Sequence, residues 1–315
     1  MALLLSEDSV DDLARELFDR ILEFGESTSP TKGKADELRA VTLELRNPRA
    51  RLSRTAQRGR LFSSLGELCW YLSGSDDVAA IAYYLAKYND FAVDNRVPSA
   101  YGPRLFNFDG FNQLATIVDS LRKNQWTRKA VVQLFDHEDL ALSGEVPCTC
   151  NLQFMLRQDA LELIVFMRSN DAYIGLVHDV FAFTMIQELV ACTIGVELGS
   201  YVHIVGSMHL YEVNRDNART YLSEGWQSIA PMPAMPRTDP REGLDWLLEV
   251  EGRLRLAQDP LDVDLVGPDP YWSDLVRLLA IFGLMKQKRV SDIKRLQPTL
   301  QSRAYDLYIA EKLAG

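Results

Sequence analysis

The sequence predicts an α+β protein in which helices pack against one large β-sheet. Segments with the two-residue alternation of strands fill the middle of the chain, and segments with helical periodicity lie near both ends. The two kinds of segment do not alternate regularly, as they would in a parallel α/β protein. No Pro/Gly/Ser-rich linker and no fixed-period repeat divides the 315 residues. We therefore predict a single domain over residues 1–315.

The first third of the chain is predicted to be mainly helical, with one strand. Ser9 can cap a helix whose apolar face runs from Leu13 to Leu22. Apolar and polar residues alternate from Val41 to Leu45, which predicts a half-buried strand. Further helices are predicted over residues 61–72, 78–88 and 111–123, the last after the turn Asp109-Gly110.

The middle of the chain supplies most of the predicted strands. A strand over residues 130–135 precedes a hairpin whose arms cover residues 152–156 and 161–167. A helix over about residues 179–194 and a strand over residues 201–205 follow, and the chain is again helical after about residue 244. Because Gln187 and Glu188 interrupt the first of these helices, we expect it to be too short and too polar to span a membrane.

The net charge of -10 argues against a general nucleic-acid binder, which needs a basic face to neutralise phosphates. An acidic protein can still bind one small phosphate through a local cluster of arginines and lysines. Residues 1–5 contain no basic residue and are followed by Glu7 and Asp8. We therefore expect no signal peptide and a cytoplasmic location.

The four cysteines show no disulfide framework, and a chain of this length needs none. Cys148 and Cys150 lack both the spacing and the neighbouring histidines of a zinc site. The sequence therefore predicts no metal site.

Three features that lie close together in the sequence have complementary chemistry. Cys148 offers a thiol nucleophile, Arg168-Ser169 an anion clamp, and Asp179 a group that can read a base. Each also has a simpler interpretation: a buried small cysteine, a surface salt bridge and a helix N-cap, respectively. Since all three occur together, the sequence favours chemistry on a nucleotide.

Other candidates extend this site. Arg128-Lys129, at the start of a predicted strand, can add cations to a phosphate site. His209 and Tyr211 lie two apart on an extended segment, so they point the same way and can hold a sugar hydroxyl. A buried histidine and tyrosine without a function are an equally good interpretation. Glu67 lies in an apolar run, where an ionised carboxylate is costly unless it is paired or acts as an acid or base.

Five ordered motifs between about residues 40 and 222 resemble those of the thymidylate synthase family. They are residues 65–74 (Leu-Gly-Glu-Leu-Cys-Trp-Tyr-Leu-Ser-Gly), Ala100-Tyr101-Gly102, Pro147-Cys148, residues 168–175 (Arg-Ser-Asn-Asp-Ala-Tyr-Ile-Gly) and residues 203–211 (His-Ile-Val-Gly-Ser-Met-His-Leu-Tyr). The resemblance implies that family's fold, a large mixed sheet flanked by helices. It also implies a homodimer in which the sheet forms the interface and the active sites are shared.

The same resemblance implies roles for individual residues. Cys148 would attack carbon 6 of a pyrimidine, Glu67 and Tyr101 would assist proton transfer, and Asp179 would stabilise charge on the base. The implied co-substrate is 5,10-methylenetetrahydrofolate. The implied nucleotide-binding residues are Arg168, Ser169, Asp171, Ala172, His209 and Tyr211, with Arg128 and Lys129 donated across the dimer interface and a further cation from the loop over residues 32–34. The implied folate-binding residues are Asp171, Gly175 and Asn89.

Asp179 is the most informative departure from the family, which has an asparagine that reads uracil at this position. An amide complements the carbonyl and ring N–H of uracil. Cytosine instead offers an amino donor and an unprotonated ring nitrogen, which a carboxyl group matches when a proton lies between them. An aspartate here resembles the deoxycytidylate hydroxymethylases of this superfamily. It therefore predicts a cytosine nucleotide as substrate.

Other departures also suggest a hydroxymethylating relative. Residues 89–91 lack the tryptophan that shields the folate methylene, and residues 311–315 do not form the short apolar tail that closes many members' sites. A wetter site would let water capture the methylene group, giving a hydroxymethyl product. Three further departures, His178 for a phenylalanine, Ser207 for an aspartate and Met167 for a glutamine, instead indicate that the folate and base contacts differ from those of the family.

The sugar is predicted from Ala172 and Lys129. Ala172 is smaller than the apolar residue common in the family, and Lys129 replaces one of a pair of arginines. The extra space can admit a 2′-hydroxyl, so CMP is the preferred substrate, as in hydroxymethylases of nucleoside-antibiotic pathways. The alternatives are a dCMP hydroxymethylase, a thymidylate synthase that methylates dUMP, and a relative that binds without catalysis.

Overall fold

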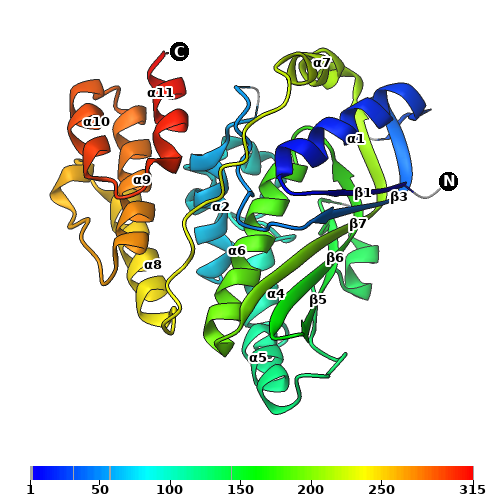
Figure 1. Ribbon diagram of the computed structural model, residues 1–315, viewed down its shortest axis with the longest axis horizontal. Coiled ribbons are helices and arrows are strands. Elements are labelled where there is room, and N and C mark those ends of the chain that lie inside the picture. The colour runs from blue at the N-terminus through cyan, green and yellow to red at the C-terminus, as the bar shows by residue number, and fades with distance from the viewer. Residues whose placement is uncertain (1–2, 31, 57, 143, 315) are drawn as a thin grey trace.

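The computed structural model describes residues 3–30, 32–56, 58–142 and 144–314. Within them, seven strands form a mixed sheet in the order β1-β3-β7-β6-β5-β4, with β2 paired to β3 (Figure 1). β1 with β3 and β6 with β7 are parallel, and the other pairs are antiparallel. The strands are β1 Leu3–Glu7, β2 Glu26–Thr28, β3 Ala35–Leu45, β4 Val131–Gln133, β5 Thr149–Arg157, β6 Ala160–Asp171 and β7 Glu197–Tyr211. The predicted α+β class with a large mixed sheet is confirmed.

Helices build up in layers from one face of this sheet. Helix α6 packs on β6 and β7, α2 packs on α6, and α8 and α9 pack on the far side of α2 (Figure 1). The α-helices are α1 Val10–Phe24, α2 Leu61–Leu72, α3 Val78–Ala82, α4 Tyr101–Phe106, α5 Gln113–Lys123, α6 Leu176–Ile194, α7 Arg215–Ser223, α8 Arg241–Leu256, α9 Pro270–Lys286, α10 Val290–Leu296 and α11 Asp306–Ala314. As a result, α2 lies between the sheet layer and the C-terminal helices.

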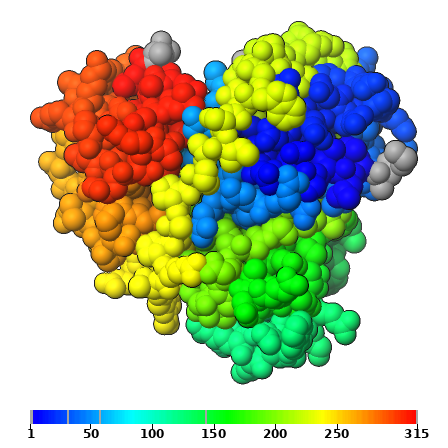
Figure 2. Space-filling model, viewed as in Figure 1, coloured from blue at the N-terminus to red at the C-terminus, as the bar shows by residue number. Residues whose placement is uncertain are grey.

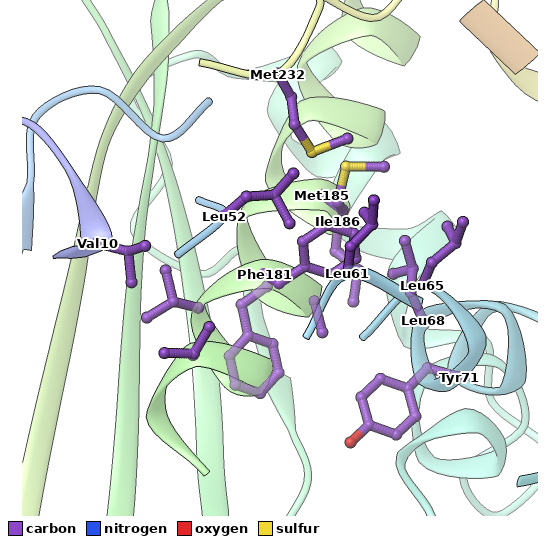
Figure 3. Close-up of a cluster of buried hydrophobic side chains, with 14 of the residues drawn as sticks. Val10, Leu52, Leu61, Leu65, Leu68, Tyr71, Phe181, Met185, Ile186 and Met232 are labelled. Atoms are coloured by element: carbon purple, nitrogen blue, oxygen red, sulfur yellow. The ribbon is translucent and has the colours of Figure 1, made fainter. Parts of the chain in front are cut away.

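The contact between α2 and α6 is apolar. Leu61, Leu65 and Leu68 of α2 are buried with Phe181 and Met185 of α6 in one cluster (Figure 3). Complete burial of one such side chain contributes roughly 1.5–3 kcal/mol. The two helices are therefore held firmly against each other, which fixes the relative positions of the polar residues they carry.

The C-terminal helices are joined to the rest of the protein by buried polar contacts. The hydroxyl of Tyr84 donates to Glu251 of α8 at 2.9 Å. The segment that leads into α8 is fixed by Glu188 of α6, which accepts from the backbone N–H of Met235 at 3.0 Å and from the buried Arg51 at 2.5 Å. In Figure 2 the segment over residues 225–240, drawn in yellow, runs along the boundary between the C-terminal helices and the sheet layer.

Most of the predicted helices and strands are confirmed, with changes in their bounds. Ser9 is the N-cap of α1 and accepts from the N–H of Asp12. The hairpin of β5 and β6 turns at Gln158 and Asp159, both with positive φ. β3 and β7 extend beyond the predicted strands, and β4 is shorter than its predicted strand. β1 was not predicted.

The single helix predicted over residues 78–88 is wrong. Helix α3 ends at Ala82, and a 3₁₀ helix, η1 Ala86–Phe91, follows. Leu85 has a non-helical backbone (φ -135°, ψ 83°) that separates the two. The ring of Tyr84 packs against Gly66, where a Cβ atom would come within 2.2 Å of it. Tertiary packing therefore overrides the local helical pattern here, and the break turns Tyr88 toward Glu67.

Helix α6 begins at Leu176, earlier than predicted. By length and composition alone it could cross a membrane, so the prediction that it is too short and too polar was wrong. In the structure, however, 72% of that stretch is buried inside the protein, between the sheet and α2. This is the position of a core helix.

The residues of β5, β6 and β7 that alternate with the buried ones remain partly exposed. They form an apolar patch made of Met155, Ile164, Phe166, Val202 and Ile204, and Phe166 is 37% exposed. We call this set the outer sheet patch.

Candidate functional site

Cys148 lies directly before β5, and the register of β5 against β6 shifts between Thr149 and Asn151. Such a bulge re-aims the side chains next to it. Arg168 of β6 donates from Nε to the carbonyl of Pro147 at 2.9 Å, and its Nη2 lies 3.8 Å from Cys148 Sγ. The backbone thus holds a guanidinium against the thiol, as the sequence predicted.

The thiol of Cys148 is protonated in the free protein near neutral pH. Burial raises its pKa to about 11, opposed by the charges of Arg168 and Lys32 and supported by that of Glu145. Lys32 pairs with Glu145 at 3.1 Å. The charge of Lys32 thus acts on the thiol, and the predicted role of the loop over residues 32–34 in binding the phosphate stays a prediction.

Tyr101 lies beside the residue that follows the nucleophile. Its hydroxyl accepts from the backbone N–H of Thr149 at 3.2 Å and from the Thr149 hydroxyl at 2.9 Å. Its ring stacks against Phe183 and tilts against Tyr71. In both of these hydrogen bonds the Tyr101 oxygen is the acceptor. Its own proton is therefore available for donation into the site.

Glu67 of α2 is buried and well bound. It accepts from the hydroxyl of Tyr88, and its Oε2 lies 2.8 Å from Nδ1 of His178. The other ring nitrogen of His178 lies 3.3 Å from the hydroxyl of Ser63. Burial acts to raise the pKa of Glu67, but its bonds to His178 and Tyr88 outweigh this and hold the pKa below its ordinary value. Glu67 is therefore ionised.

Asp179, in the first turn of α6, has the opposite character. Its Oδ2 accepts from the side-chain amide of Asn170 at 2.7 Å. Burial and the charge of Glu67 raise its pKa well above the ordinary range. The N-cap of α6 is Gly175, so the interpretation of Asp179 as an N-cap was wrong. Two carboxyl groups in one site, one ionised and one neutral, form a typical acid–base arrangement.

The predicted sugar-binding residues lie at the end of β7. The ring centroids of His209 and Tyr211 are 4.9 Å apart. In the sheet, Asp171 of β6 lies opposite His209 of β7. Burial, then the charges of Asp171 and Cys148, raises the pKa of Tyr211. Ala172 is fully buried and donates its N–H to the carbonyl of His209 at 2.8 Å.

The sequence profile of the thymidylate synthase family matches residues 16–242, about seven tenths of the sequence. The chain belongs to the thymidylate synthase family. Among curated proteins it is 29% identical over 217 residues to a deoxyuridylate hydroxymethyltransferase of Bacillus phage SP01. That alignment covers 63% of this chain and 56% of the phage protein, so the chain spans little more than half of its relative's length. The C-terminal helices lie almost entirely beyond the residues that match the family.

Some of the residues that the family resemblance assigned to the site lie apart from the thiol. Arg128 and Lys129 are exposed just before β4, and no hydrogen bond or ion pair joins their side chains to the described residues of the site. Asn89 is exposed in η1, where its amide donates to the carbonyl of Ala86. Ser169 is partly exposed next to Arg168. Their binding roles stay predictions.

Gly175 and Asp171 also have structural roles, which the family motif did not reveal. A Cβ atom at Gly175 would lie 2.8 Å from Asn170 Nδ2 and 3.3 Å from Asp179 Oδ2. Asp171 accepts the N–H groups of Tyr173 and Ile174 at 2.8 and 2.9 Å. Both residues therefore shape the turn that leads from β6 into α6.

Sequence reasoning missed three polar residues behind Asp179. Asn170 occupies the variable position of the Arg-Ser-x-Asp motif, and His203 and Tyr201 are buried in β7. Buried polar residues in an apolar strand were the available signal. Within the described residues, no group of three or more His, Cys, Asp or Glu side chains could hold a metal ion.

Proposed function

We propose that this protein catalyses folate-dependent 5-hydroxymethylation of a cytosine mononucleotide, with CMP preferred. The observation that carries the proposal is the buried Asp179 carboxyl, which accepts from Asn170 at 2.7 Å and whose pKa is raised well above its ordinary value by burial and the charge of Glu67, favouring the acid form. A carboxylic acid has one O–H donor and one acceptor oxygen. The edge of cytosine offers a ring nitrogen that accepts and an amino group that donates, so the two edges are complementary.

The site residues divide the chemistry among them. Cys148 adds as a thiolate to carbon 6 of the base, which makes carbon 5 nucleophilic, and Arg168 stabilises the thiolate. Glu67 and Tyr101 accept and donate the protons that move at carbon 5. The balanced reaction takes CMP, methylenetetrahydrofolate and water to 5-hydroxymethyl-CMP and tetrahydrofolate. The new hydroxyl oxygen comes from water, and Cys148 leaves at the end.

A hydroxymethyl product, rather than a methyl group, is supported by polar groups where water must act. His178 and Ser63 extend from Glu67 as a polar chain, in place of the phenylalanine that the family has at residue 178. The phage relative is itself named a hydroxymethyltransferase. Water that reaches this chain can add to the methylene group before a hydride does.

The residues around the thiol fit methylenetetrahydrofolate as the co-substrate. Asp171 is held by two backbone amides of the turn before α6, so its carboxylate has a fixed direction. Together with Gly175 and Asn89, it is our candidate for holding the folate ring system. When bound, this co-substrate supplies the one-carbon unit.

A homodimer with shared sites accounts for the exposed cations. The outer sheet patch supplies an apolar surface of the kind that associating proteins bury. Arg128 and Lys129 lie exposed just before β4, the strand at the edge of the same sheet. In such a dimer they would complete the phosphate site of the other subunit beside Arg168 and Ser169.

A second candidate is a uracil nucleotide, favoured by the name of the phage relative. A carboxylic acid can also donate its proton to a uracil carbonyl and accept from the ring N–H. Tritium release from carbon 5 of CMP, dCMP, UMP and dUMP tests the base and the sugar together. We expect CMP to react fastest and tetrahydrofolate to accumulate. Dihydrofolate formation with dUMP would instead identify a thymidylate synthase and overturn the proposal.

A further inference from the structure

A buried chain of hydrogen bonds ends on the base-reading carboxyl group. The hydroxyl of Tyr201 lies 2.7 Å from Nδ1 of His203, and Nε2 of His203 lies 3.1 Å from Oδ1 of Asn170. Asn170 Nδ2 then donates to Asp179 Oδ2 at 2.7 Å. Tyr201, His203 and Asn170 are 1%, 0% and 4% exposed, so water does not compete for these bonds.

The direction of the chain follows from its buried end. Within the described residues, His203 is the hydrogen-bond partner of the Tyr201 hydroxyl, so a proton pointing elsewhere would lack an acceptor at a cost of roughly 1–3 kcal/mol. Tyr201 therefore donates to Nδ1. Burial lowers the pKa of His203 to about 3, so the ring is neutral and its single N–H is on Nε2, donating to Asn170. The Asn170 amide is thereby fixed with its NH₂ group toward Asp179.

Fixing this amide matters because a free carboxylic acid is ambiguous. Either oxygen can carry the proton, so one orientation of the group suits cytosine and the exchanged one suits uracil. Asparagine lacks this freedom because its donor and acceptor are different atoms. A neutral aspartate can discriminate between the two bases only if something determines which oxygen is protonated.

We propose that Tyr201, His203 and Asn170 are positioning residues that keep Asp179 Oδ2 as an acceptor and its proton on Oδ1. This arrangement gives the carboxyl group a fixed donor and a fixed acceptor, so that it selects one base. The inference rests on the proposed function, in which Asp179 reads the base. Gly175 supports it, because a Cβ atom there would lie 2.8 Å from Asn170 Nδ2 and displace the amide.

The test is the ratio of the dissociation constants for dCMP and dUMP, measured by calorimetry without folate. Tyr201→Phe removes one oxygen, far from the base, and frees His203 to change tautomer. His203→Phe and Asn170→Ala remove the later members of the chain. In each variant we expect the preference for one nucleotide over the other, given by this ratio, to be weaker than in the wild type by about tenfold or more. Thr184→Val is the matched control, because Thr184 is equally buried in α6 and its hydroxyl donates to the backbone carbonyls of Val180 and Phe181 in its own helix.

The outcomes separate this inference from the proposed function. A wild-type protein that prefers cytosine, with variants that keep the full preference and unfold normally, overturns the inference alone. A wild-type preference for uracil that collapses in Tyr201→Phe overturns the cytosine proposal and supports the inference. If the wild type binds dCMP and dUMP equally well, both the inference and the cytosine proposal are overturned. If His203→Phe does not fold, Tyr201→Phe and Asn170→Ala still decide.

Discussion

Nδ1 of His178 lies 2.8 Å from Oε2 of Glu67, which joins the start of α6 to the middle of α2. Glu67 faces apolar neighbours on α2, and burial alone would favour its neutral form. Its bonds to His178 and Tyr88 reverse this and keep it ionised. Burial and that charge together raise the pKa of the neighbouring Asp179. One histidine therefore influences the protonation of both carboxyl groups.

The first prediction concerns the acidic limb of the pH–rate profile. The pKa of Glu67 is lower in the folded protein than its ordinary value, so activity that needs its carboxylate is lost only as the pH falls through that lowered pKa. His178→Phe removes the bond that lowers the pKa and leaves the burial that raises it. The acidic limb should then move to higher pH, by about one unit or more.

Ser63→Ala serves as the control for this variant. It removes the hydroxyl near the far nitrogen of His178 and leaves the contact with Glu67 in place. Its acidic limb should stay close to that of the wild type. An unchanged limb in His178→Phe would show that Glu67 does not depend on His178.

The second prediction concerns the nucleophile. Cys148→Ser should abolish turnover and retain nucleotide binding, because the phosphate clamp is separate. Because the pKa of the thiol is about 11, its thiolate fraction grows with pH throughout the neutral range. Alkylation of Cys148 by iodoacetamide, followed by mass spectrometry of its peptide, should accelerate about tenfold per pH unit. Alkylation that is already at its maximum near neutral pH would contradict this, and normal turnover by the serine variant would make Cys150 the next candidate.

Local patterns predicted the main parts of the site, but not the contacts that set its protonation. The alternation in β5 and β6 and the motif around Cys148 were sufficient to bring Arg168 to the thiol. The contact of Tyr88 with Glu67 depends on the helix break after Ala82, which results from packing of Tyr84 on Gly66. No short-range pattern contains that information.

The same limit applies to the sheet. β1 pairs in parallel with β3, with Leu3 opposite Val41, and nothing local to either strand specifies a register between such distant segments. The chain from Tyr201 to Asp179 likewise joins β7, β6 and α6. Asn170 could be found only once the fold had brought its Oδ1 within 3.1 Å of Nε2 of His203.

The third prediction tests shared active sites. An Arg128→Ala variant and a Cys148→Ala variant should each be nearly inactive. When the two are mixed and allowed to exchange subunits, one site of each mixed dimer has an intact Cys148 and receives an intact Arg128. Part of the activity should therefore return. Sedimentation that shows an active monomer at assay concentration would contradict shared sites.

The fourth prediction concerns the sugar. Ala172→Val adds two methyl groups to a fully buried position beside His209. If the space admits a 2′-hydroxyl, kcat/KM should fall more for CMP than for dCMP. Ala191→Val, at an equally buried alanine near the C-terminal end of α6, controls for overpacking, which costs about 1–3 kcal/mol. An equal loss for both nucleotides in Ala172→Val would remove Ala172 from sugar selection.

The fifth prediction tests the base reading on which the proposed function depends. Asp179→Asn replaces a carboxylic acid with an amide that complements the carbonyl and ring N–H of uracil. A buried polar mismatch costs on the order of 1–3 kcal/mol, so cytosine should lose about tenfold to a hundredfold against uracil. The measurement is kcat/KM by tritium release from carbon 5 of the paired nucleotides. The amide can still accept from Asn170, so the fold should tolerate the change. Retention of the full cytosine preference would mean that another group reads the base, and the uracil nucleotides would again become candidate substrates.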